Sequence, residues 1–118
     1  MTATSIAPES LTRTTTSLPQ AFLERCARSP EREAYRYPVG DDWRSLTWKQ
    51  AGERVRAIAA GLLSLGLDRE ARVAILCATR YEWVLMDLGV LCAGGATTTV
   101  YPSSTAEECA YILRDSDT

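Results

Sequence analysis

Residues 72–101 read RVAILCATRYEWVLMDLGVLCAGGATTTVY, and this stretch decides the fold. It opens with a compact apolar run over residues 72–77, which is typical of a strand covered on both faces. Thr79-Arg-Tyr-Glu82 has the form of a capping box and predicts a helix that continues to about residue 93. Gly94-Gly95 ends this helix, and residues 96–101, rich in threonine and valine, predict a second strand. This order, with short connections, predicts parallel βα units with a right-handed crossover.

The helix predicted over residues 80–93 is apolar almost all the way round, which predicts that it is buried on several sides. Asp87 is its only charge beyond the first turn, so we expect a partner for this carboxylate. A catalytic role for Asp87 is the alternative, although the chain offers no histidine and a single lysine to work with it. We interpret Trp83 and Met86 as core residues, with a ligand platform as the alternative.

Two further helices and a hairpin are predicted upstream. Thr47-Trp-Lys-Gln50 is a capping box, and the apolar stripe behind it ends at Leu65, with Gly66 placed to stop the helix. An earlier helix begins at residue 18, and Pro30 marks its end. Two short strand-like pieces lie between these helices and predict a β-hairpin: residues 34–37 and 43–46.

The ends of the sequence complete the architecture. Ser104 and Thr105 each precede a glutamate by three residues and predict the cap of a last helix, which runs to about residue 114. Residues 1–17 include nine serines or threonines and show no apolar period, which predicts a flexible arm. Two parallel strands and a hairpin are too few for a stable, doubly covered sheet. We therefore predict an α/β fold in which residues 18–118 are the truncated front portion of a larger domain.

Composition excludes several classes of function. The chain has 118 residues, 24% of them charged, and a net charge of −2, so nucleic acid is not expected as a partner. The absence of histidine removes the commonest general base and metal ligand, and we expect no metal site. The four cysteines form no CxxC pair, which favours reduced, structural thiols in a cytoplasmic protein. We expect no signal peptide, because no charged segment followed by an apolar run opens the sequence, and the longest apolar run is too short to span a membrane.

The loop Tyr101-Pro102-Ser103-Ser104-Thr105 is the candidate ligand site. It follows the carboxyl end of a predicted parallel strand, where open α/β sheets bind ligands, and it leads into a helix N-terminus with free N–H groups. A proline-kinked loop with a doubled N-cap is the alternative interpretation. Gly94-Gly95-Ala96 lacks the spacing of a phosphate-binding loop, so we interpret it as a helix stop.

Three blocks of the sequence resemble the adenylate-forming enzymes, the acyl-CoA synthetases and their relatives. They are SLTWKQ (45–50) with AGLLSLG (60–66), RVAILCATRYEWVLMDLG (72–89), and GGATTTVYPSSTAE (94–107) with YILRDS (111–116). The turn TRYEW (79–83) and the loop VYPSS (100–104) resemble the long-chain fatty acid–CoA ligases of actinobacterial type. The excess of arginine over lysine, twelve to one, is typical of a GC-rich genome and agrees with that source.

The resemblance implies that residues 18–118 form the front portion of the N-terminal domain of the adenylate-forming fold. It implies a parent ligase that uses ATP, Mg²⁺ and CoA to convert a fatty acid into acyl-CoA, AMP and pyrophosphate through an acyl-adenylate. The family's phosphate loop, metal-binding glutamate and catalytic lysine would all lie after Thr118, so no catalytic residue is expected here. The fragment is then inactive alone and binds no cofactor, and its partner is the remainder of the parent polypeptide. By position, Tyr101, Pro102 and Ser103 would lie close to CoA, with proline where some relatives have glycine.

Two other interpretations stay open. The parent belongs to the same superfamily but is a carboxylate reductase or a peptide-synthetase adenylation domain. Alternatively, the chain is a non-catalytic module that self-associates as a homodimer through helix 80–93 or the edge strand 96–100. We expect the protein in the cytoplasm, with contact at a membrane surface as the alternative.

Overall fold

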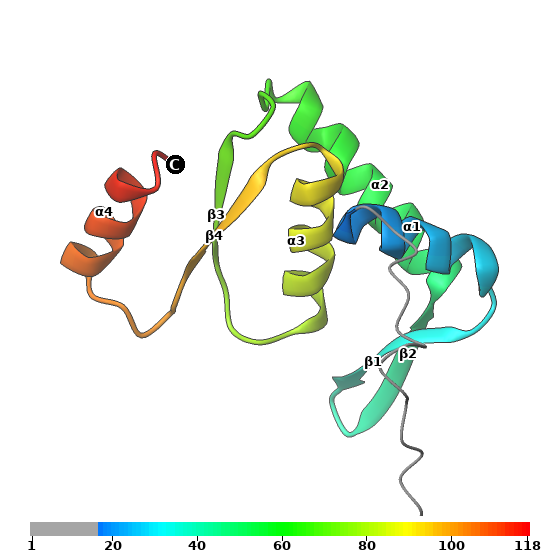
Figure 1. The fold of residues 1–118 in the computed structure, drawn as a ribbon. Helices are drawn as coiled ribbons and strands as arrows, with labels where there is room; N and C mark the ends of the chain where they lie inside the picture. The colour runs from blue at the N-terminus through cyan, green and yellow to red at the C-terminus, as the bar shows by residue number, and fades with distance from the viewer. Residues whose placement is uncertain (1–16) are drawn as a thin grey trace, which may run out of the picture.

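Four helices and four strands make up the computed structural model, which describes residues 17–118 (Figure 1). The predicted flexible arm, residues 1–17, lies outside the described residues except for Ser17. Ser17 is the N-cap of the first helix, because its Oγ accepts a hydrogen bond from the backbone N–H of Gln20 at 3.3 Å. The elements in order are α1 (Leu18–Arg28), β1 (Glu33–Val39), β2 (Asp42–Thr47), α2 (Trp48–Ser64), β3 (Arg72–Leu76), α3 (Tyr81–Cys92), β4 (Ala96–Val100) and α4 (Ala106–Asp115).

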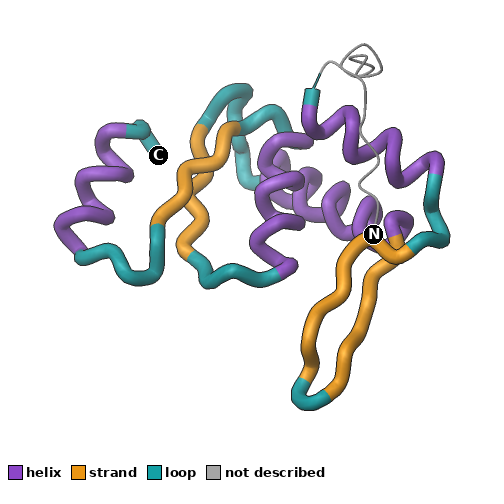
Figure 2. Tube along the Cα trace, turned by 60° about the horizontal axis from the view of Figure 1, so that its bottom comes forward, coloured by secondary structure: helices purple, strands orange, loops and turns teal. Residues whose placement is uncertain are grey.

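Strands β1 and β2 form the predicted hairpin, whose base packs against the helices and whose turn projects away from them (Figure 2). The strands are antiparallel, and the turn between them is made by Gly40, whose positive φ of 61° favours glycine. Side chains alternate along β2, so Leu46 is buried against the helices. Trp43, three residues earlier, is 66% exposed on the opposite face of the hairpin.

Helix α2 begins and ends as its sequence predicts. The Thr47 N–H donates to Gln50 Oε1 at 2.9 Å, and the Gln50 N–H donates to Thr47 Oγ1 at 3.2 Å, which completes the capping box. At the other end Gly66 adopts a φ of 89°, and the Leu67 N–H reaches back to the Leu62 carbonyl at 3.1 Å. This is a Schellman stop, in which the glycine supplies the left-handed residue.

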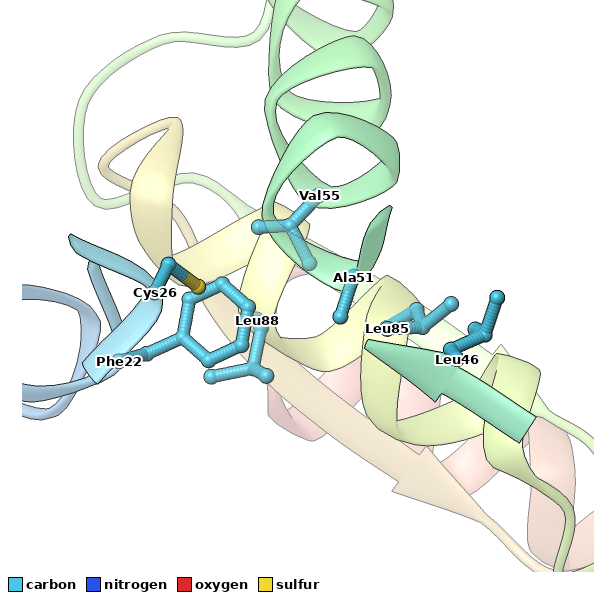
Figure 3. Close-up of a cluster of buried hydrophobic side chains, with 7 residues drawn as sticks. All are labelled: Phe22, Cys26, Leu46, Ala51, Val55, Leu85 and Leu88. Carbon is cyan, nitrogen blue, oxygen red and sulfur yellow. The ribbon is translucent and has the colours of Figure 1, made fainter. Parts of the chain in front are cut away.

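The hydrophobic core lies among helices α1, α2 and α3 and the base of the hairpin (Figure 3). Each of the three helices and strand β2 of the hairpin contributes buried side chains to it: Phe22, Cys26, Leu46, Ala51, Val55, Leu85 and Leu88. Helix α3 crosses α2 closely at Gly89, where any side chain would collide with Ile58. The predicted burial of α3 is therefore confirmed. Leu85, Leu88 and Val90 are buried within the chain, so these three residues are not available to the dimer interface that was predicted through helix 80–93.

Strands β3 and β4 pair in parallel, as predicted, with Val73 beside Thr97 and Ile75 beside Thr99. Helix α3 packs against one face of this pair, and α4 lies on the other side, close to β4 (Figure 1). The expectation that the first strand is covered on both faces is wrong. Val100 of β4 is buried, whereas Leu76, its neighbour on β3, is 61% exposed.

Two expectations for residues of α3 also need correction. Asp87 is half-buried and forms no ion pair or hydrogen bond with another described residue. It lies about half a turn round the helix from Leu85 and about a quarter of a turn from Leu88, both of which face the core, so its charge is at the edge of the buried face and needs no buried partner. Trp83 and Met86 are likewise half-buried and outside the core cluster. All four cysteines are free thiols, as predicted.

Candidate functional site

A pocket of about 540 Å³ opens at the carboxyl ends of β3 and β4. One wall is the loop between β3 and α3, the other is the start of the loop after β4, and the first turn of α3 closes the end. This is the position where open α/β sheets bind ligands, and the volume falls in the usual range for ligand pockets. The residues that line the pocket are Cys77, Ala78, Thr79, Arg80, Trp83, Val84, Thr99, Tyr101 and Pro102.

The predicted loop residues separate into two groups. Tyr101 and Pro102 line the pocket, and the Tyr101 side chain is 69% exposed. Ser103 lies outside the pocket, in a neighbouring hollow beside α4 that it shares with Ser104 and Tyr111. A turn separates the two groups, closed by a 3.0 Å hydrogen bond from the Ser104 N–H to the Tyr101 carbonyl. Of the doubled N-cap, Thr105 alone caps α4, through a capping box with Glu108.

The start of α3 differs from the prediction, and the difference shapes the pocket. Thr79 does not cap the helix; the N-cap is Arg80, which makes no side-chain capping bond. Instead Arg80 forms a fork with Glu82: its Nε and Nη2 donate to the two carboxylate oxygens, each at 2.7 Å. The Glu82 carboxylate is therefore engaged by Arg80 and is not free to reach back to Thr79, as a capping box requires.

The Arg80–Glu82 fork changes the acidity of both groups. Hydrogen bonds from the guanidinium lower the pKa of Glu82 from 4.5 to about 2. The same hydrogen bonds, followed by the negative charge of Glu82, raise the pKa of Arg80. Both side chains are largely exposed, 58% for Arg80 and 42% for Glu82, so this pair orients a side chain more than it stabilises the fold.

A second hollow, of about 680 Å³, lies between β1 and the start of α3. Here the rings of Tyr37 and Tyr81 stack at a centroid distance of 4.1 Å, and Arg54 Nη1 donates to Tyr81 Oη at 3.4 Å. Arg80 lines both hollows, whereas Glu82 lines this second one only. The fork therefore forms the ridge between the two.

The thiols differ in their surroundings. Burial raises the pKa of Cys26 and of Cys92, and the positive charge of Arg56 opposes this rise in both cases. Both therefore remain protonated, poorly reactive core residues. Cys77 and Cys109 are half-buried, and of these Cys77 alone lines the pocket.

Two negative findings concern residues 17–118. This part of the chain holds no cluster of three or more His, Cys, Asp or Glu side chains able to bind a metal ion. Its helices are also too short or too polar to cross a lipid bilayer.

Sequence reasoning anticipated one wall of the pocket and missed the other. Tyr101 and Pro102 were expected because they follow a strand directly. The sequence places Cys77 at a strand end and Arg80 in a helix cap. It favours the core for Trp83, with a ligand platform as the alternative, and Trp83 lines the pocket. The available signal was the order strand, loop, helix, strand, which places residues 77–80 beside residue 101 at one end of a parallel pair.

Comparison with known proteins gives consistent matches. Residues 22–118 match the family described as AMP-binding enzyme. The long-chain-fatty-acid–CoA ligase FadD15 of Mycobacterium bovis is 38% identical over 88 residues, which cover 75% of this chain and 15% of that protein. The phosphinothricin tripeptide synthetase PhsB of Streptomyces viridochromogenes is 40% identical over 100 residues, 85% of this chain and 8% of PhsB.

Solved structures agree with the sequence relatives. The fatty acid AMP ligase of Legionella pneumophila superposes with a TM-score of 0.81 at 25% identity, over 96% of this chain and 20% of the ligase. Each of these proteins is much longer than the part that matches: the chain spans about 15% of the length of FadD15.

Proposed function

Because this chain belongs to the AMP-binding enzyme family, we propose that it forms the N-terminal part of a long-chain fatty acid–CoA ligase. The observation that carries the proposal is the 38% identity to FadD15, over a segment that includes most of the described fold. The family and the α/β fold are common to many carboxylate-activating enzymes, so the choice of a fatty acid as substrate rests on this relative.

The reaction proposed for the complete ligase has two steps. The fatty acid carboxylate attacks the α-phosphate of ATP, which yields an acyl-adenylate and pyrophosphate. The CoA thiol then attacks the acyl carbon and releases AMP. Mg²⁺ would neutralise phosphate charge in the first step. We assign the chemical steps to the remainder of the polypeptide, because the family's phosphate loop, metal-binding glutamate and catalytic lysine are not found in this sequence.

The contribution of this chain would be to binding. We propose that Tyr101 and Pro102 lie beside CoA in the complete enzyme, because they line the pocket at the carboxyl ends of the strands. Ser103, which lies outside that pocket, would contribute less. The remainder of the polypeptide would supply the catalytic groups, and the 118-residue chain would be inactive alone, in the cytoplasm.

A peptide-synthetase adenylation domain is the second candidate, favoured by the 40% identity to PhsB. Such a domain also forms an adenylate, but it transfers the acyl group to a carrier arm. A carboxylate reductase would do the same.

Two chimeras separate these candidates. Residues 22–118 replace the matching segment in FadD15 and, separately, in PhsB. Each chimera is assayed for adenylate formation with palmitate and with amino acids, and for acyl-CoA formation after CoA is added. We expect palmitoyl-CoA from the FadD15 chimera, no amino acid activation by the PhsB chimera, and no activity from the 118-residue chain. Pyrophosphate release by the chain alone would overturn the proposal. So would an inactive FadD15 chimera with a normal melting temperature beside an active PhsB chimera.

A further inference from the structure

The pocket contains one charged residue, Arg80, among the nine that line it. Trp83 and Tyr101 contribute aromatic rings from different elements, and Val84, Ala78 and Pro102 make the rest largely apolar. A guanidinium at the edge of an aromatic, apolar pocket is a common arrangement for a ligand that combines a flat ring with a negative charge. The proposed function assigns only Tyr101 and Pro102 of this pocket.

Glu82 determines where the guanidinium of Arg80 lies. The fork uses Nε and Nη2 of Arg80, and the described residues engage none of its other N–H groups. A guanidinium carries five N–H donors, so donors remain for an anion. Glu82 does not line this pocket, so no carboxylate among the residues that line it would repel a bound anion. The fork with Glu82 also holds the Arg80 side chain in place before a ligand binds. Less conformational entropy of this side chain is therefore lost on binding than for a flexible arginine.

We infer that Arg80 is the anion-binding residue of this pocket and that Glu82 is its positioning residue. The inference rests on the proposed function, because the ligand of the required chemistry would then be the phosphorylated adenosine of CoA. Its adenine would contact the aromatic wall, and one of its phosphates would accept hydrogen bonds from Arg80. The loop between β3 and α3 therefore forms the second wall of the nucleotide site.

Cys77 provides a direct measurement, because its thiol is half-buried and lines the same pocket. The 118-residue chain is treated with iodoacetamide at increasing concentrations of adenosine 3′,5′-bisphosphate, and alkylation of each cysteine is followed by peptide mass spectrometry. We expect saturable protection of Cys77 and unchanged alkylation of Cys109, which lies on α4 outside the pocket. Adenosine, which lacks phosphate, should protect more weakly.

Variants test the two roles. Arg80→Gln should raise the half-protecting concentration of the bisphosphate about tenfold, the loss expected for a charged hydrogen bond, and leave that of adenosine unchanged. Arg36→Gln is the matched control, because Arg36 is also exposed and paired with a glutamate, Glu33, but lies outside this pocket. Glu82→Gln should weaken protection if Glu82 positions Arg80, and strengthen it if Glu82 only competes for its charge.

In the alkylation experiment, three results would overturn the inference: no protection of Cys77, equal protection in the wild type and Arg80→Gln, or tighter binding in Glu82→Gln. These results are distinct from failure of the proposed function. An active FadD15 chimera whose KM for CoA is insensitive to Arg80→Gln would refute the inference alone. Protection of Cys77 beside an inactive chimera would refute the proposed function and leave the nucleotide site in place.

Discussion

Gly89 of α3 lies so close to Ile58 of α2 that a Cβ atom built on Gly89 would stand 2.8 Å from Ile58 Cβ. The branched side chain of Ile58 cannot withdraw, because its own Cβ is the atom approached. The two helices can therefore approach this closely only with glycine at position 89. This contact joins the two helices that enclose the core.

We predict that Gly89→Ala destabilises the protein, although alanine has the higher helix propensity. Forcing the helices apart should cost about 1–3 kcal/mol, as other overpacked cores do. Gly61→Ala is the matched control, because Gly61 lies in α2 with open space around it and should gain about 0.5–1 kcal/mol. Urea unfolding of both variants measures the difference, and equal stability of the two would contradict the crossing described here.

The two threonines of the predicted capping boxes should behave differently. Thr47→Ala removes an observed capping bond and should cost about 1 kcal/mol. Thr79→Ala removes none, because α3 begins with Arg80 as an uncapped N-cap, so its stability should be close to that of the wild type. Thermal unfolding compares the stability of the two variants. A similar loss of stability in both would show that Thr79 does cap α3.

Acid should break the Arg80–Glu82 fork. The pKa of Glu82 falls from 4.5 to about 2 on folding, so the contribution of the pair is present above pH 4.5 and is lost as the pH falls toward 2. An NMR titration of the Glu82 carboxyl should give a midpoint near 2 in the wild type, and Arg80→Gln should move it back toward 4.5. The same midpoint in both proteins would mean that the fork is not formed in solution.

Neighbouring residues of β3 should differ in the cost of truncation. Ile75 is buried, so Ile75→Ala should lose about 2–5 kcal/mol. Leu76 points to the other face and is 61% exposed, so Leu76→Ala should lose less than about 1 kcal/mol. Denaturant unfolding of the two variants reports on the uncovered face of the strand, and equal losses would show that this face is covered.

The elements that sequence reasoning predicted are those with local signals. Thr47, Gln50 and Gly66 mark both ends of α2, and alternation around Gly40 marks the hairpin. The start of α3 was predicted wrongly because Thr79 and Glu82 have capping-box spacing, whereas the intervening Arg80 takes the carboxylate at shorter range. A pattern of residue types does not reveal which of two possible partners an acid will choose.

For a related reason, the sequence predicts only one of the two walls of the pocket. Tyr101 and Pro102 follow a strand directly, so their position at its carboxyl end needs no knowledge of the rest of the chain. Trp83 was interpreted as core because α3 is apolar on every side, and only the packing of α3 against α2 decides which side is left for the pocket. Exposure of Leu76 likewise depends on where α4 lies, which the sequence of β3 does not contain.

The order of the core residues along the chain bears on synthesis at the ribosome. Every member of the buried cluster lies between Phe22 and Leu88, and β4 and α4 contribute none. Helices α1 to α3 and the hairpin can therefore condense as soon as α3 has left the exit tunnel, while β4 is still inside the tunnel and cannot yet pair with β3. Only afterwards does β4 pair with β3 and complete the pocket. The nascent protein would thus gain its stability early and its candidate binding site late.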